Sequence, residues 1–142
     1  MWNFHQLFRF TVCSSVDEHK SFWENRDPIK RFVGPFIFFV IFMIIKKAEQ
    51  YVKSQYRKDF YKFHVMVVKK CALRLADQLG GDKEILELAV LFHDSTINTH
   101  GNRIHHITGA ESAERFLTKE DYPQERIEHV KQCILTHRVN DE

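Results

Sequence analysis

The chain has 142 residues, a length that suits one domain and allows a sizeable core to be buried. Its 21 basic and 19 acidic residues give a formal net charge of +2, so charge gives no indication of a nucleic-acid-binding protein. The three cysteines, Cys13, Cys71 and Cys133, form neither a CxxC pair nor a disulfide framework. Free thiols are typical of a reducing compartment, so we expect a cytoplasmic protein.

The first 42 residues differ in composition from the rest, since they hold nine of the 13 phenylalanines and both tryptophans. They lead into an apolar run over 32–45, which lies between Lys30-Arg31 and Lys46-Lys47. A spanning helix needs about 20 apolar residues, so this run is too short to cross a membrane. It also lies too far from the N-terminus to be a secretory signal.

Three interpretations of the run remain: a buried or partner-binding helix, a shallow membrane anchor, or sequence foreign to the domain. We favour the last, because a well-formed amphipathic pattern begins only at Met43. We therefore predict that 1–42 is an N-terminal extension with little fixed structure, that Met43 is the natural start, and that 43–142 forms the domain.

Downstream of Met43 the spacing of apolar residues predicts successive helices. The first covers about 44–57 and the second about 60–79, each with an apolar stripe at intervals of three and four residues. Gly80-Gly81 ends the second helix, and Asp82 is the expected N-cap of a third helix over 83–92.

After Asp94 the periodicity stops, and the polar, histidine-rich segment 95–106 reads as a loop over a site. Thr108 and Glu111 match a capping box, which predicts a helix that starts at Thr108. A last helix follows Pro123. No strand pattern is present, so the predicted fold class is all-α.

Histidines continue the apolar stripes of three different helices: His64, His93 and His137. A single inward histidine usually finds one hydrogen-bond partner, but three such rings beside Asp94 indicate a shared site. Buried imidazoles that converge stay neutral, and neutral imidazoles with a carboxylate suit a divalent ion such as Mn, Mg, Ni, Co, Fe or Zn.

The order of these residues resembles the HD-domain metal-dependent phosphohydrolases over about 44–138. The likeness is carried by His64 in 61–68, by His93-Asp94 at the end of 88–94, by His106-Ile107-Thr108-Gly109-Ala110, and by Ile134-Leu135-Thr136-His137. The resemblance implies an HD-domain-like helical bundle with metal between helices. It implies that His64, His93 and Asp94 hold a first divalent ion, and that His106 and His137 hold a second one in dinuclear members.

The activity that this resemblance implies is hydrolysis of a phosphomonoester or phosphodiester, commonly of a nucleotide. Metal-activated water attacks, with His93 and Asp94 at the centre and Asp94 bridging the ions. Arg103 and Arg138 are candidates to hold a phosphate oxygen. The expected partner is a small phosphorylated substrate, with no nucleic acid and no membrane partner, and the oligomeric state is left open.

Two departures from the family pattern stand out. Ser95-Thr96 follow the His-Asp pair where many relatives have Ile-Gly, and the family's last aspartate ligand has no counterpart on a helix beyond His137. Asp141 lies four residues past His137, but we expect instead that the domain is truncated at its C-terminus. The alternative function is a non-catalytic HD-like scaffold or sensing module, or a protein associated with a membrane through 32–45.

Overall fold

The computed structural model describes residues 30–137, with side chains from residue 39 onward. Residues 1–29 of the predicted extension, and Arg138 and Asp141, lie outside the described residues. Every regular element within the described range is a helix, which confirms the all-α prediction. The elements are α3 (Lys30–Lys53), α4 (Lys58–Phe60), the π-helix η1 (Tyr61–Val65), α5 (Met66–Leu79), α6 (Lys83–Phe92), α7 (Ile97–His100), α8 (His105–Lys119) and α9 (Gln124–Thr136).

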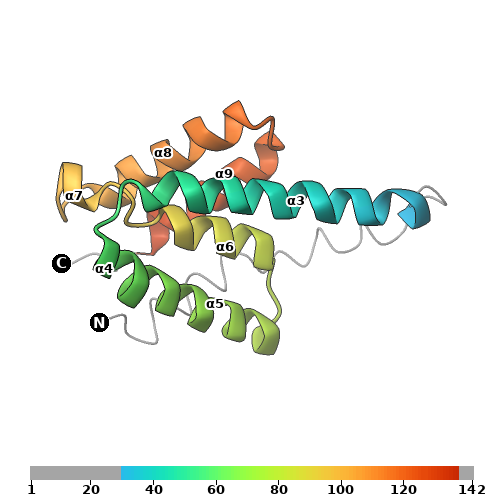
Figure 1. Cartoon of the computed structure of the whole chain (residues 1–142), viewed down its shortest axis with the longest axis horizontal. Coiled ribbons are helices and arrows are strands. Elements are labelled where there is room, and N and C mark those ends of the chain that lie inside the picture. Colours follow the sequence, from blue (N-terminus) through green and yellow to red (C-terminus); the bar gives the residue numbers. More distant parts are fainter. Residues whose placement is uncertain (1–29, 138–142) are drawn as a thin grey trace.

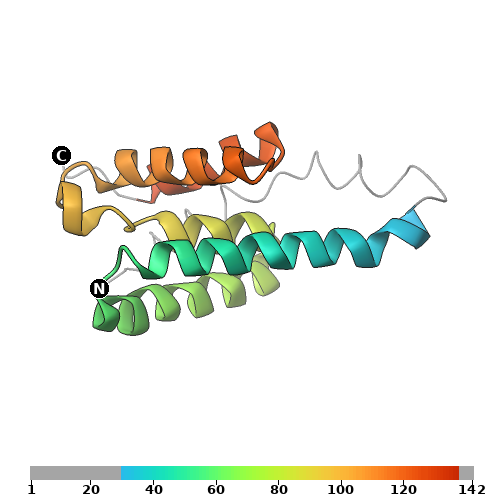
Figure 2. The ribbon, with the colours of Figure 1, turned by 45° about the horizontal axis from the view of Figure 1, so that its top comes forward.

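Helix α6 is the centre of the bundle. Its residues from 88 to 92 are all apolar and fully buried, and the helix is contacted by α3, α5, α8 and α9. Figure 1 shows α6 between α3 and α5, and Figure 2 shows α8 and α9 on the side of α6 away from these two helices. The C-terminal end of this central helix leads directly into His93 and Asp94, so the most enclosed part of the fold carries the predicted site.

Helix α3 is longer than the sequence pattern indicated. It begins at Lys30 rather than at residue 44, and it crosses the predicted boundary between 42 and 43 without interruption. Figure 2 shows its N-terminal part projecting beyond the other helices. Residues 30–42 are therefore helical, while the division into extension and domain stays a prediction. No helix in the described range has both the length and the apolar character needed to cross a membrane.

The start of α6 is capped as predicted. One carboxylate oxygen of Asp82 accepts hydrogen bonds from the backbone N–H groups of Glu84 and Ile85, both at 3.1 Å, and the other oxygen pairs with Arg126 at 2.9 Å. The cap satisfies two of the amide groups that a helix leaves without partners at its N-terminus.

We expect Asp82→Ala to lower the free energy of unfolding by about 1 kcal/mol, because the two amides lose their acceptor. Asp82→Asn keeps an acceptor oxygen and is expected to retain most of the stability. Urea unfolding of both variants measures the difference. An equal loss in the two variants would show that the ion pair with Arg126, and not the cap, stabilises this end of α6.

The predicted start of the helix at Thr108 is wrong, because α8 begins three residues earlier, at His105. Thr108 is not an N-cap: its Oγ1 donates to the Ile104 carbonyl at 3.2 Å and lies 2.6 Å from Oγ1 of Thr96. The segment predicted as a loop also contains the short helix α7. The earlier start gives His105 a fixed place in the first turn of α8.

Candidate metal centre

His64 is aimed at the centre by the π-helical turn η1, which replaces regular α-helix between α4 and α5. Such turns rotate a side chain away from its regular α-helical position and are frequent at functional sites. The ring packs against Phe60 with a centroid separation of 4.6 Å. Its Nε2 lies 3.3 Å from Nε2 of His93 and 3.1 Å from Oδ2 of Asp94.

His93 and Asp94 follow the last turn of α6, and both are buried, with His93 fully so. Nδ1 of His93 lies 2.7 Å from the Val90 carbonyl oxygen. Because a carbonyl oxygen only accepts, Nδ1 carries the hydrogen, and Nε2 is turned toward Oδ2 of Asp94 at 3.0 Å.

His105 and His137 approach the other oxygen of Asp94. Their Nε2 atoms lie 3.1 Å and 3.8 Å from Oδ1, and 3.2 Å from each other. Nδ1 of His105 donates to the Asn102 carbonyl at 2.7 Å, and Nδ1 of His137 donates to the Ile134 carbonyl. Both rings are buried, with 4% of each residue exposed.

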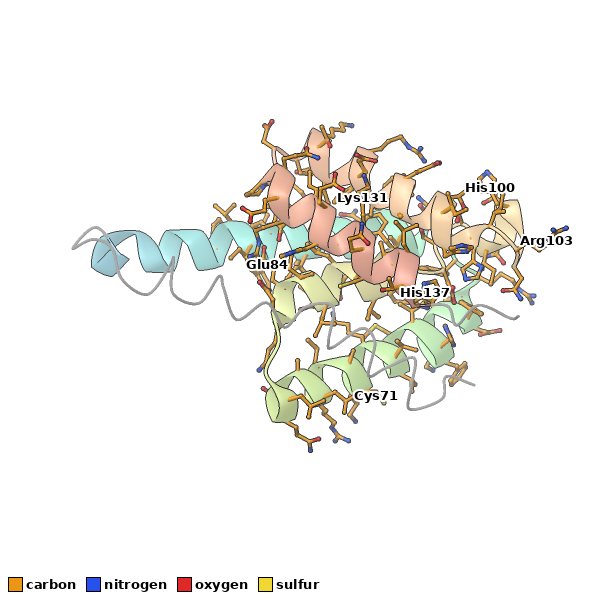
Figure 3. All side chains as sticks on the ribbon, turned by 180° about the vertical axis from the view of Figure 1, so that it is seen from behind. Cys71, Glu84, His100, Arg103, Lys131 and His137 are labelled. Atoms are coloured by element: carbon orange, nitrogen blue, oxygen red, sulfur yellow. The ribbon has the colours of Figure 1, made fainter. Side chains whose placement is uncertain are left out.

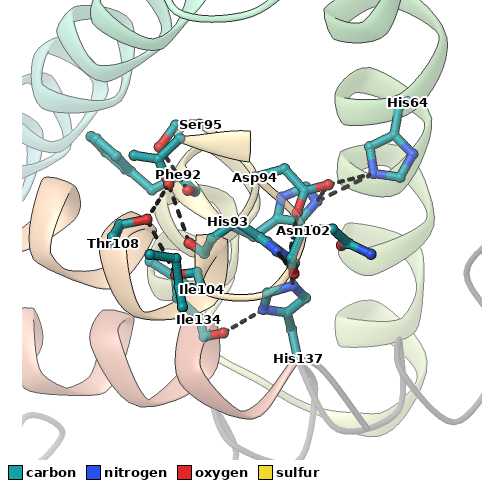
Figure 4. Close-up of polar contacts among 12 residues, drawn as sticks. His64, Phe92, His93, Asp94, Ser95, Asn102, Ile104, Thr108, Ile134 and His137 are labelled. Carbon is teal, nitrogen blue, oxygen red and sulfur yellow. Dashed lines mark hydrogen bonds and ion pairs between the residues drawn. The ribbon is translucent and has the colours of Figure 1, made fainter. Parts of the chain in front are cut away.

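Three of the four rings are therefore held in the same way. In His93, His105 and His137, Nδ1–H binds the carbonyl of the residue three positions earlier, which leaves Nε2 to face Asp94. Such bonds fix the tautomer and the orientation of metal-binding histidines. Figure 4 shows His64, His93 and His137 turned toward the Asp94 carboxylate from separate segments of the chain.

The electrostatics favour a cation at this point. Burial alone would raise the pKa of Asp94, but its interactions with His93, His105 and His64 outweigh burial and hold that pKa well below its usual value. Burial, reinforced by repulsion from His93, lowers the pKa of His137 to about 3, so this ring is neutral near pH 7. A neutral His137 with hydrogen on Nδ1 directs a lone pair on Nε2 into the cluster.

The residues form two groups that share Asp94. One consists of His64, His93 and Asp94, and the other of Asp94, His105 and His137, with the ligand atoms within 4.8 Å of one another in each group. Imidazole nitrogen with a carboxylate oxygen is a donor set that fits a divalent transition metal. The described residues thus offer one position for an ion on each side of the carboxylate.

The structure brings together four of the residues expected from the sequence: His64, His93, Asp94 and His137. It places His105, rather than the expected His106, in the second group. His106 is half-buried, and its ring packs edge-on against that of His105 at a centroid distance of 5.8 Å.

The structure gives no support for the two arginines that we expected to bind phosphate. Arg103 is exposed, and Figure 3 shows it in the segment before α8, near His100. Arg138 lies outside the described residues. Their role in phosphate binding stays a prediction.

Tyr56 is a positioning residue that the sequence analysis did not identify. Its buried hydroxyl donates to the Leu91 carbonyl at 3.0 Å and so ties the segment after α3 to the end of α6. Burial and the charge of Asp94 raise the pKa of Tyr56 well above its usual value, so the hydroxyl keeps its proton and remains a donor. This bond supports the turn that presents His93 and Asp94.

Comparisons of the chain with protein-family models, with curated proteins and with solved structures find no match. The candidate metal centre therefore depends on its own geometry and chemistry.

Proposed function

We propose that this chain is a metal-dependent phosphohydrolase of the HD type, which hydrolyses a small phosphomonoester or phosphodiester such as a nucleotide. One observation carries the proposal: each oxygen of the buried carboxylate of Asp94 is faced by Nε2 atoms from two histidines, and the four rings come from separate segments.

A purely structural hydrogen-bond network is a poorer account of this arrangement. The bonds to backbone carbonyls place hydrogen on Nδ1 of His93, His105 and His137, so their neutral forms present lone pairs to Asp94 and to neighbouring rings. One carboxylate balances only one imidazolium, and several buried imidazolium ions would repel one another. A divalent cation would satisfy these lone pairs together and would displace protons as it binds.

The ligand types narrow the choice of ion. Sites rich in imidazole suit Fe, Ni and Zn, and the addition of a carboxylate makes them suitable for Mn and Co. Mg prefers oxygen ligands and retains several waters. Mg is therefore the weakest candidate for this cluster of four imidazoles. The two groups that share Asp94 support one ion or two.

A divalent ion held by these ligands would supply Lewis-acid activation of water and of a phosphoryl oxygen. The residues themselves fix the ligand geometry and exclude bulk water: His93, His105 and His137 are buried, and three backbone carbonyls hold their rings. The His64 side chain is 27% exposed, so we infer that substrate approaches on its side. Attack of water on phosphorus breaks the P–O ester bond, and the leaving group takes up a proton.

The test combines elemental analysis of the purified full chain with an assay of phosphate release from an aryl phosphate. We expect stoichiometric divalent metal, and a release of phosphate that stops after chelation and returns when Mn²⁺, Co²⁺ or Zn²⁺ is added. Absence of stoichiometric metal after loading with each ion would overturn the proposal. Stoichiometric metal without any phosphate release from esters and nucleotides would favour the non-catalytic module.

A matched pair of variants tests the assignment of residues. His93→Ala is expected to remove metal binding and phosphate release, because His93 contributes to the most buried part of the cluster. His129→Ala is the control, since His129 lies on α9 and belongs to neither group of ligands. Equal losses in both variants would show that the ligand roles are misassigned.

A further inference from the structure

Helix α8 makes an unusually close backbone contact with the end of α6. Gly109 is buried in this contact, and a Cβ atom built there would lie 2.9 Å from the Phe92 carbonyl oxygen and 3.0 Å from that of His93. Both atoms belong to the backbone, so they cannot rotate away as a flexible side chain would. Glycine is a poorer helix former than alanine, and helix propensity therefore gives no reason for it inside α8.

The close contact determines where His105 lies. His105 precedes Gly109 by four residues, about one helical turn, so both face α6. Next to this contact, Oγ1 of Thr96 lies 2.6 Å from Oγ1 of Thr108 and donates to the His105 carbonyl at 3.3 Å. The separation of α8 from α6 thus sets the 3.1 Å distance between Nε2 of His105 and Oδ1 of Asp94.

We propose that the contact at Gly109 joins the two halves of the metal centre, with Gly109 as a positioning residue for His105. The part of this inference that concerns metal binding rests on the proposed function. The group of His64, His93 and Asp94 is carried by η1 and the end of α6, so none of its ligands lies on α8. Because His105 lies on the same helix as Gly109, we expect a larger residue at 109 to affect the group of Asp94, His105 and His137 more than the other group.

The experiment compares the full wild-type chain with Gly109→Ala. Calorimetric titration of the metal-free proteins with Co²⁺ is expected to give two ions per wild-type chain. In the variant we expect the second ion, the one held by Asp94, His105 and His137, to be lost or to bind about 10- to 100-fold more weakly. This is the range seen when residues that orient metal ligands are changed. The first ion, held by His64, His93 and Asp94, is expected to keep its affinity.

Gly80→Ala is the matched control. Gly80 ends α5 with φ of 75°, and a Cβ there meets nothing within 4 Å, so the variant is strained locally without moving α8. We expect it to bind both ions as the wild type does. Loss of the second ion in both glycine variants would mean that general destabilisation is responsible, and would overturn the inference.

Crystal structures of the metal-free wild type and Gly109→Ala give a readout that does not depend on metal. A longer separation of His105 from Asp94 in the variant supports the inference, and an unchanged separation overturns it. A wild-type chain that binds no Co²⁺ contradicts the proposed function instead, and the structural comparison still decides the role of Gly109.

A second variant covers the case in which Gly109→Ala does not fold. Thr96→Val removes the hydroxyl that donates to the His105 carbonyl and contacts the Thr108 hydroxyl, while the shape of the side chain is nearly unchanged. It is expected to weaken the second ion as well, and Thr96→Ser is expected to restore it. Wild-type binding of both ions by Thr96→Val would show that the contact does not position His105.

Discussion

Asp94→Asn is expected to abolish metal binding and phosphate release together, reducing activity to the uncatalysed rate. Asp94 is the carboxylate that both ligand groups share, and its two oxygens face His64 and His93 on one side and His105 and His137 on the other. The amide has nearly the same shape but no charge, so it cannot balance a divalent ion among four imidazoles. Metal content and release of phosphate from an aryl phosphate measure the two losses.

The control for this change is Asp77→Asn, which makes the same substitution on an exposed side chain of α5. The Asp77 side chain is 60% exposed and pairs with Lys83 at the surface. We expect it to retain full metal content and activity, since exposed ion pairs contribute little. A chain with Asp94→Asn that still holds stoichiometric metal would place the ion elsewhere, and the assignment of this cluster would fail.

Local sequence signals were sufficient to predict the central helix and the inward direction of three histidines. The predicted limits of α6 agree with the structure, because both its cap at Asp82 and its apolar sequence are local signals. His64, His93 and His137 each continue an apolar stripe, and each lies in the cluster. A stripe records which side of a helix is covered, so a histidine that extends it points to the interior.

His105 was missed because a local signal competed with a tertiary contact. Thr108 and Glu111 have the spacing of a capping box, but the Thr108 hydroxyl lies against Thr96, and the helix starts at His105 instead. One signal was available: His105 precedes the buried Gly109 by four residues, just as the other histidines extend their stripes. His106 precedes buried Ala110 in the same way, so periodicity could not separate the two rings.

The start of α3 was mispredicted for a different reason. The amphipathic pattern begins at Met43 because the helix becomes covered from there on: Ile44, Ala48 and Val52 are buried. Before that point apolar residues lie on exposed faces as well, with Phe39 60% exposed. The pattern therefore indicated where α3 packs against the bundle and not where its backbone becomes helical.

Phe92→Ala is expected to produce the largest loss of stability, about 3–5 kcal/mol in the free energy of unfolding. Phe92 is fully buried between Tyr51 of α3 and Phe116 of α8, with ring centroids 5.9 Å and 5.5 Å away. Domains have only about 5–15 kcal/mol of stability in total, so the variant is close to unfolding. Urea unfolding measures the loss, and Phe39→Ala on the exposed part of α3 is expected to change stability by no more than about 0.5 kcal/mol.

Added metal then separates the role of Phe92 in the fold from that of Asp94 in binding. Phe92→Ala leaves all five ligand residues in place, so Co²⁺ at about 100 times its dissociation constant should stabilise the folded variant by about 2.7 kcal/mol. Co²⁺ should not stabilise Asp94→Asn, because the folded variant has lost the site and binds the ion no more tightly than the unfolded chain does. If Co²⁺ stabilised both variants equally, the ion would bind outside this cluster, and the convergence of imidazoles on Asp94 would need another explanation.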